Sequence, residues 1–152
     1  MQGRMWSLMR AGCAALFVAV MAAGAHAQKV NTASGGVAVK GYDVVAYVTA
    51  GKPVEGSEQF VHRIGRTTYR FSSAANRDAF AKEPGRYLPQ FGGFCAYAVS
   101  RGYTADVDPR AWRIVGGKLY LNYDRGAQAK WEEDLSGNIS KGDAHWPALS
   151  RR

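Results

Sequence analysis

The sequence predicts a small α+β domain in which short β-hairpins pack against short helices. Two segments rich in β-forming residues each contain a two-residue turn with glycine, which is the pattern of a β-hairpin. Short stretches with helical spacing follow them, each after a Ser, Asn or Asp that can cap a helix. The 152 residues contain no internal repeat and no low-complexity block, so we expect a single domain.

The first half of this domain is expected to hold one hairpin between two helices. Residues 28–40 are small and polar with paired glycines, which predicts a flexible lead-in before a domain over residues 41–152. A short amphipathic helix is expected within residues 42–51. Residues 59–71 predict a hairpin that turns at Gly65-Arg66, and a two-turn helix should follow until Pro84 stops it.

The second half repeats the pattern of hairpin followed by helix. Residues 85–94 alternate aromatic residues with Pro and Gly, which predicts an irregular, partly buried segment. Residues 112–121 form the clearest hairpin pattern and turn at Gly116-Gly117. Asn122 or Asp124 can cap the next helix, and a final helical segment is expected over residues 138–149.

The first 27 residues predict a signal peptide. Arg4 and Arg10 form a positive start, an uncharged apolar run follows, and residues 25–27 match the small-x-small cleavage pattern. The apolar run is shorter than the ~20 residues that a spanning helix needs. We therefore expect cleavage after Ala27, no transmembrane segment in the mature chain, and a periplasmic or secreted protein.

The charge of the mature chain does not indicate a nucleic-acid partner. Two of the 20 basic residues and none of the 12 acidic residues lie in the leader, so the remainder carries a net charge of +6. The basic residues are scattered, with no run longer than Arg151-Arg152. This surplus favours anionic surfaces of the cell envelope, and we expect no binding to nucleic acid.

Cys95 is the single thiol outside the leader, and it lies in the segment Gly92-Gly93-Phe94-Cys95-Ala96. An unpaired cysteine is unusual in an exported protein, because oxidising compartments tend to pair or modify thiols. It is a packed small hydrophobe, a metal ligand, a redox site or half of an intermolecular bridge. No second cysteine, recognisable catalytic triad or phosphate loop accompanies it, so no catalytic residue is assigned and we expect a protein without enzymatic activity.

Residues 58–90 resemble the core of a YHS domain. The resemblance rests on two features. The first is the second strand of the hairpin with the residues after it, Thr67-Thr68-Tyr69-Arg70-Phe71-Ser72-Ser73. The second is a small helix with the spacing Phe-x-x-x-Pro-x-x-Tyr at its end, formed by Phe80, Pro84 and Tyr87. The wider mature chain is similar to exported YHS-domain proteins of bacterial envelopes. The family implies a small metal-binding module with cysteine ligands, but Ser72 and Asn76 occupy the positions of two of those ligands. We expect Ser72 to cap the helix and Asn76 to bind a nearby backbone group.

A metal site would therefore need other donors. Cys95 and His62, together with a carboxylate such as Asp43, could form a mononuclear site for a transition metal such as copper or zinc. All four methionines lie in the leader, which argues against copper trafficking. The alternative for His62 is a half-buried histidine on the hairpin.

A third interpretation is a pocket for a small apolar or planar ligand. Asp43, Tyr42, Tyr47 and Trp112 could line it with Cys95 at its edge; the alternative is that these aromatic residues form the core of the small domain. Two hypotheses remain. The first is an exported binding module for a metal ion or small ligand around Cys95. The second is a structural or interaction domain of the envelope, with another envelope protein as its partner and a buried, inert Cys95.

Overall fold

The computed structural model describes residues 28–152, so the predicted signal peptide lies outside the described residues. Its strands, α-helices and 3-10 turns are, in chain order, β1 (Thr32–Ala33), η1 (Ser34–Gly36), β2 (Val37–Ala38), η2 (Val39–Gly41), α1 (Ala46–Thr49), β3 (Ser57–Ile64), β4 (Thr67–Phe71), α2 (Ala74–Lys82), α3 (Pro84–Tyr87), η3 (Gln90–Gly93), α4 (Ala96–Ser100), β5 (Asp108–Val115), β6 (Lys118–Asn122), α5 (Arg125–Glu133) and α6 (Leu135–Leu149). The predicted α+β class is confirmed.

A four-stranded sheet organises the first half of the domain. Its strand order is β1-β2-β4-β3, with β2 parallel to β4 and the other pairs antiparallel. The predicted hairpin forms β3 and β4, and Ile64 pairs with Thr67 across its two-residue turn. Helix α2 packs on this sheet through Phe80, whose ring lies 4.9 Å from that of Tyr69 and 5.1 Å from that of Phe71.

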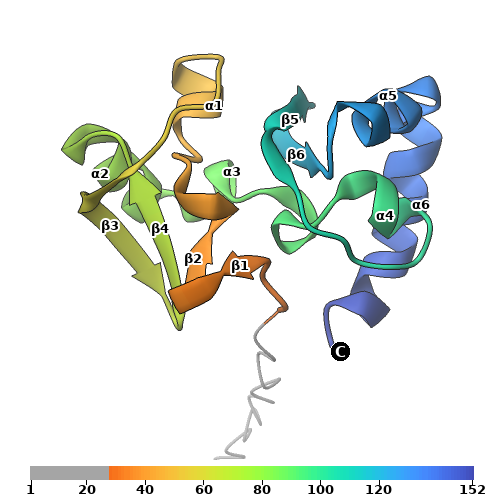
Figure 1. Ribbon diagram of the computed structural model, residues 1–152, viewed down its shortest axis with the longest axis horizontal. Coiled ribbons are helices and arrows are strands. Elements are labelled where there is room, and N and C mark those ends of the chain that lie inside the picture. The colour runs from red at the N-terminus through yellow and green to blue at the C-terminus, as the bar shows by residue number, and fades with distance from the viewer. Residues whose placement is uncertain (1–27) are drawn as a thin grey trace, which may run out of the picture.

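The second half contains a two-stranded antiparallel sheet, β5-β6, packed with α4, α5 and α6. In Figure 1 the two sheets lie on opposite sides of the molecule, with α3 between them. The turn at Gly116-Gly117 has φ values of +57° and +76°, which glycine adopts without the steric penalty of a Cβ. Buried side chains from both halves, among them Val44, Phe71 and Leu121, form one shared core cluster.

Two segments differ from the sequence-based expectation. Residues 28–40 were expected to form a flexible lead-in, but they contain strands β1 and β2. These strands extend the sheet, and Val37 of β2 pairs with Thr68 of β4. The segment after Cys95 forms the short helix α4, which the sequence reading did not predict. Both depend on contacts with residues distant in the chain. None of the helices within residues 28–152 is long and apolar enough to cross a membrane.

Candidate functional site

Cys95 is buried at the start of α4, with 1% of its surface exposed. Its Sγ accepts a hydrogen bond from the Ala98 backbone N–H at 3.5 Å and donates one to Asn122 Oδ1 at 3.6 Å. The Tyr97 backbone N–H also donates to that oxygen, at 3.1 Å, which fixes the orientation of the Asn122 amide. The carbonyl oxygen of Asn122 therefore faces the sulfur and accepts its hydrogen bond.

Asp43 does not lie at a ligand pocket but is a fully buried hydrogen-bond acceptor. Its Oδ1 accepts from the backbone N–H groups of Val45 at 2.9 Å and Ala46 at 3.2 Å, at the entry to α1. Its Oδ2 accepts from the Ser72 backbone at 2.9 Å, the Ser72 hydroxyl at 2.7 Å and the Asn76 amide at 2.8 Å. Because a carboxylate offers about four lone-pair sites, these five donors leave none for a ligand.

Ser72 and Asn76 therefore have other partners than the sequence suggested. Ser73, not Ser72, caps α2 by accepting from the Asn76 backbone N–H at 3.1 Å. The side chains of Ser72 and Asn76 both donate to the Asp43 carboxylate rather than to backbone groups. Ser72 and Asn76 thus belong to one polar cluster with Asp43, in which Asp43 is buried, Asn76 is half-buried and Ser72 is exposed.

The aromatic residues proposed as ligand contacts do not surround Cys95. Tyr47 is 1% exposed, and its hydroxyl donates to the Pro109 carbonyl at 2.7 Å. Desolvation by burial raises the pKa of Tyr47 strongly, and the nearby Tyr42, Asp108 and Asp43 add to the effect. The Trp112 ring lies 5.2 Å from that of Tyr47. Tyr47 therefore packs against Trp112 of strand β5, and neither residue lines the pocket at Cys95.

His62 is half-buried on β3, with its ring edge-on to Phe80 at 5.6 Å. Within residues 28–152 there is no group of three or more His, Cys, Asp or Glu side chains that could hold a metal ion. The proposed donors are separately engaged: Cys95 by Asn122, Asp43 by its five donors and His62 by an aromatic contact. A site for copper or zinc at Cys95 and His62 gains no support from this arrangement.

A pocket of about 460 Å³ does lie above Cys95. Cys95, Ala98 and Ala105 contribute small side chains, and helix α5 contributes Gly126, Ala127 and Lys130, which share one helix face. Three tyrosines, Tyr97, Tyr103 and Tyr123, and the carboxylate residue Asp124 complete the lining. Tyr103 and Tyr123 are 52% and 57% exposed, which is high for aromatic residues.

A pocket beside Cys95 was one of the interpretations that the sequence left open, but Tyr103, Tyr123 and helix α5 were not expected to line it. Tyr103 lies in the loop after α4, close to Cys95 along the chain, whereas Tyr123 follows β6 and is distant from Cys95 in sequence. The one available signal was the spacing of Gly126, Ala127 and Lys130 in the predicted helix. Small residues one turn from a lysine leave space on a helix surface, but they do not indicate which segment faces that space.

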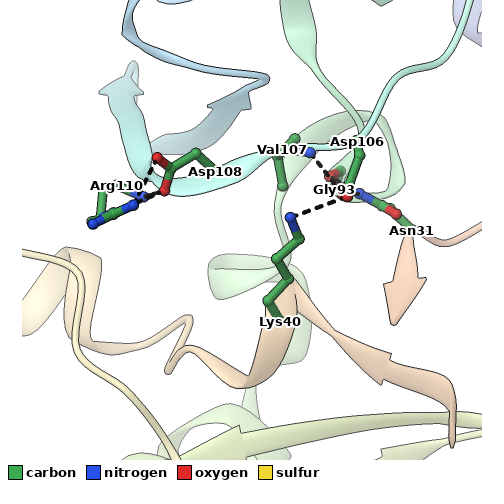
Figure 2. Close-up of polar contacts among 7 residues, drawn as sticks. All are labelled: Asn31, Lys40, Gly93, Asp106, Val107, Asp108 and Arg110. Atoms are coloured by element: carbon green, nitrogen blue, oxygen red, sulfur yellow. Dashed lines mark hydrogen bonds and ion pairs between the residues drawn. The ribbon is translucent and has the colours of Figure 1, made fainter. Parts of the chain in front are cut away.

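A second, more polar pocket of about 480 Å³ adjoins the first and shares Tyr123 with it. Figure 2 shows the charged groups there. Lys40 Nζ lies 3.1 Å from Asp106 Oδ2, and the Asn31 amide donates to Asp106 Oδ1 at 3.0 Å. Arg110 pairs with Asp108 at 3.1 Å. All four charged groups are thus engaged in local ion pairs.

These contacts shift the pKa values of both carboxyl groups. Partial burial opposes ionisation of Asp106, but hydrogen bonds from Asn31, the Val107 backbone and Lys40 outweigh it and lower the pKa of Asp106. Hydrogen bonds from the Arg110 side chain and backbone lower the pKa of Asp108. Through Asn31 and Lys40, the network joins the segment before β1 and the turn η2 to Asp106, in the segment that leads into β5.

Comparison with known proteins adds no relative to this description: no protein-family model, no curated protein and no solved structure matches the chain.

Proposed function

We propose that this protein is an exported, non-catalytic binding domain of the YHS type, and that it holds a small organic ligand in the pocket above Cys95. The observation that carries the proposal is the pair of exposed tyrosines, Tyr103 and Tyr123, beside a concave surface with an apolar floor. Its volume of about 460 Å³ falls within the range of about 300–1,000 Å³ typical of small-molecule sites.

Cys95 has a structural role in this proposal. Cys95 is one of the residues that line the pocket, while the hydrogen bonds of its sulfur hold the start of α4 against Asn122 of β6. A buried, hydrogen-bonded thiol shapes the pocket without reacting with its occupant. The proposal favours an organic ligand over a metal ion because the candidate metal donors are engaged elsewhere.

Nuclear magnetic resonance with indole, a neutral aromatic probe, tests this site directly. We expect indole at millimolar concentration to shift the amide signals of Ala98, Ala105 and Ala127. Tyr103→Ala combined with Tyr123→Ala should remove these shifts and leave the rest of the spectrum unchanged, since both side chains are exposed. Ile64→Ala is the matched control, because Ile64 is 41% exposed but lines a different groove.

Shifts that are absent, or that persist unchanged in the double variant, would refute the pocket as the binding site. That result would favour the second hypothesis, a structural or protein-interaction domain of the envelope. Export is tested separately by sequencing the N-terminus of the protein recovered from the periplasm or medium. We expect the mature chain to begin at Gln28.

A further inference from the structure

We propose that the ligand of this pocket is an aromatic anion whose carboxylate, or a similar acidic group, pairs with Lys130. This inference rests on the proposed function and adds the chemical class of the ligand. The inference is based on the Lys130 ammonium group, which forms no salt bridge within residues 28–152, and on the exposed phenol rings of Tyr103 and Tyr123 in the same pocket.

Lys130 is the cation that the pocket leaves available. It lines the pocket from α5 and is exposed, and it forms no salt bridge with another residue of 28–152. The pocket's one carboxylate, Asp124, caps α5 by accepting from the Ala127 backbone N–H at 2.7 Å. Asp124 therefore serves the helix start, and the ammonium group of Lys130 can take an external partner.

A second cation lies beside the same pocket. The Arg101 guanidinium lies 5.7 Å from the centre of the Tyr97 ring, in a cation–π contact. Within the lining, the Lys130 ammonium and the Asp124 carboxylate balance each other. Arg101 does not line the pocket, but it contacts Tyr97 of the lining and adds a positive charge nearby, which favours an anion over an amine. The positive charge of the mature chain acts in the same direction at longer range.

The tyrosines select the rest of the ligand. Tyr103 and Tyr123 are both about half exposed and both line the pocket, so a planar ring that packs on them would remove apolar area from water. An aliphatic acid of the same charge would lack the favourable ring–ring geometry. A flat ring with one acidic substituent matches both features of the lining.

Indole-3-acetate and its uncharged amide, indole-3-acetamide, test the proposal as a matched pair. We expect the native protein to bind the acetate about fivefold more tightly than the amide at low salt, which is the size expected for a solvent-accessible ion pair. This preference should decrease in 0.5 M NaCl because salt screens exposed charges. Titrations that follow the amide signals of Ala98 and Ala127 give both affinities.

Lys130→Gln should make the two affinities equal, while the amide binds as it does to the native protein. Lys118→Gln is the control, since Lys118 is exposed on β6 and does not line this pocket; it should retain the preference. Equal binding of acetate and amide to the native protein, or an unchanged preference in Lys130→Gln, would overturn the anion assignment while indole binding still supports the proposed function. If no indole compound binds, the proposed function fails and the inference fails with it.

Discussion

The Asn76 amide donates a 2.8 Å hydrogen bond to Asp43 Oδ2, so a side chain of α2 meets the residue that begins the turn into α1. The same carboxylate receives the Ser72 hydroxyl and backbone at the end of β4. One buried acid thus joins three segments, namely the start of α1, the end of β4 and helix α2. We regard this polar cluster as a structural element of the fold.

Asp43→Asn should destabilise the fold by about 2–4 kcal/mol, because the replacement turns one acceptor oxygen into a donor that faces buried donors. Urea denaturation followed by circular dichroism measures this change. Asp78→Asn is the control, since the Asp78 carboxylate is 69% exposed and forms only a surface ion pair with Arg77. Equal stability of the two variants would contradict the role assigned to Asp43.

The hairpins could be predicted because turn and strand are local properties of the sequence. Residues around Gly65 and Gly116 carry both the turn chemistry and the β-forming flanks, and the structure places hairpins at both positions. Strand β2 could not be predicted in this way, since Val37 pairs with Thr68 across a long chain separation. Local patterns do not encode such pairing.

The candidate site, like the fold, could be predicted from the sequence only in part. Cys95 was identified as unusual from composition alone, and it does lie at a pocket. Asp43 and Tyr47 looked like site residues because polar and aromatic groups stand out in a short sequence, yet both have internal partners. Tyr103 and Tyr123 contribute to the pocket through tertiary contacts between a loop and the end of a strand, which no spacing rule reveals.

The Cys95 thiol should react with 5,5′-dithiobis(2-nitrobenzoate) at least about a hundredfold more slowly in the native protein than in urea, because reaction requires local opening. The increase in absorbance at 412 nm measures both rates. Ser136→Cys adds a thiol at an exposed position of α6 and should react at once in the native state. Fast native labelling of the unmodified protein would contradict a buried, inert Cys95.

Gly142→Ala should destabilise the protein although alanine favours helices. A Cβ at Gly142 would lie 2.6 Å from the Phe91 Cζ atom, and Phe91 is itself buried. The overlap would force the Phe91 ring or helix α6 to move, which typically costs about 1–3 kcal/mol. Gly85→Ala is the matched change in α3, where a Cβ meets no atom within 4 Å, and should leave the thermal midpoint unchanged or higher.

Asp106 should make stability sensitive to acid. Its pKa is lowered in the folded state, so the stabilisation is present above the ordinary pKa of an unfolded aspartate and disappears as the pH falls through the lower folded value. Because this carboxylate is 54% exposed, we expect an effect below about 1 kcal/mol. Urea midpoints of Asp106→Asn between pH 2 and 6 should fall less steeply than those of the native protein. Identical slopes would show that the contacts with Asn31 and Lys40 add nothing.

Tyr69 should make stability sensitive to alkali. Burial raises the pKa of Tyr69 to about 12, well above the usual value for a tyrosine. A raised pKa means that the stabilisation is complete below about pH 10 and is lost as the pH rises toward 12. Over that interval Tyr69 should account for about 2–3 kcal/mol, and Tyr69→Phe should remove this part of the loss. Urea midpoints at pH 9, 10.5 and 11.5 measure it, with Tyr103→Phe as the exposed control. If the two variants lose stability equally with pH, the Tyr69 phenol ionises as freely as an exposed one and its assigned burial is wrong.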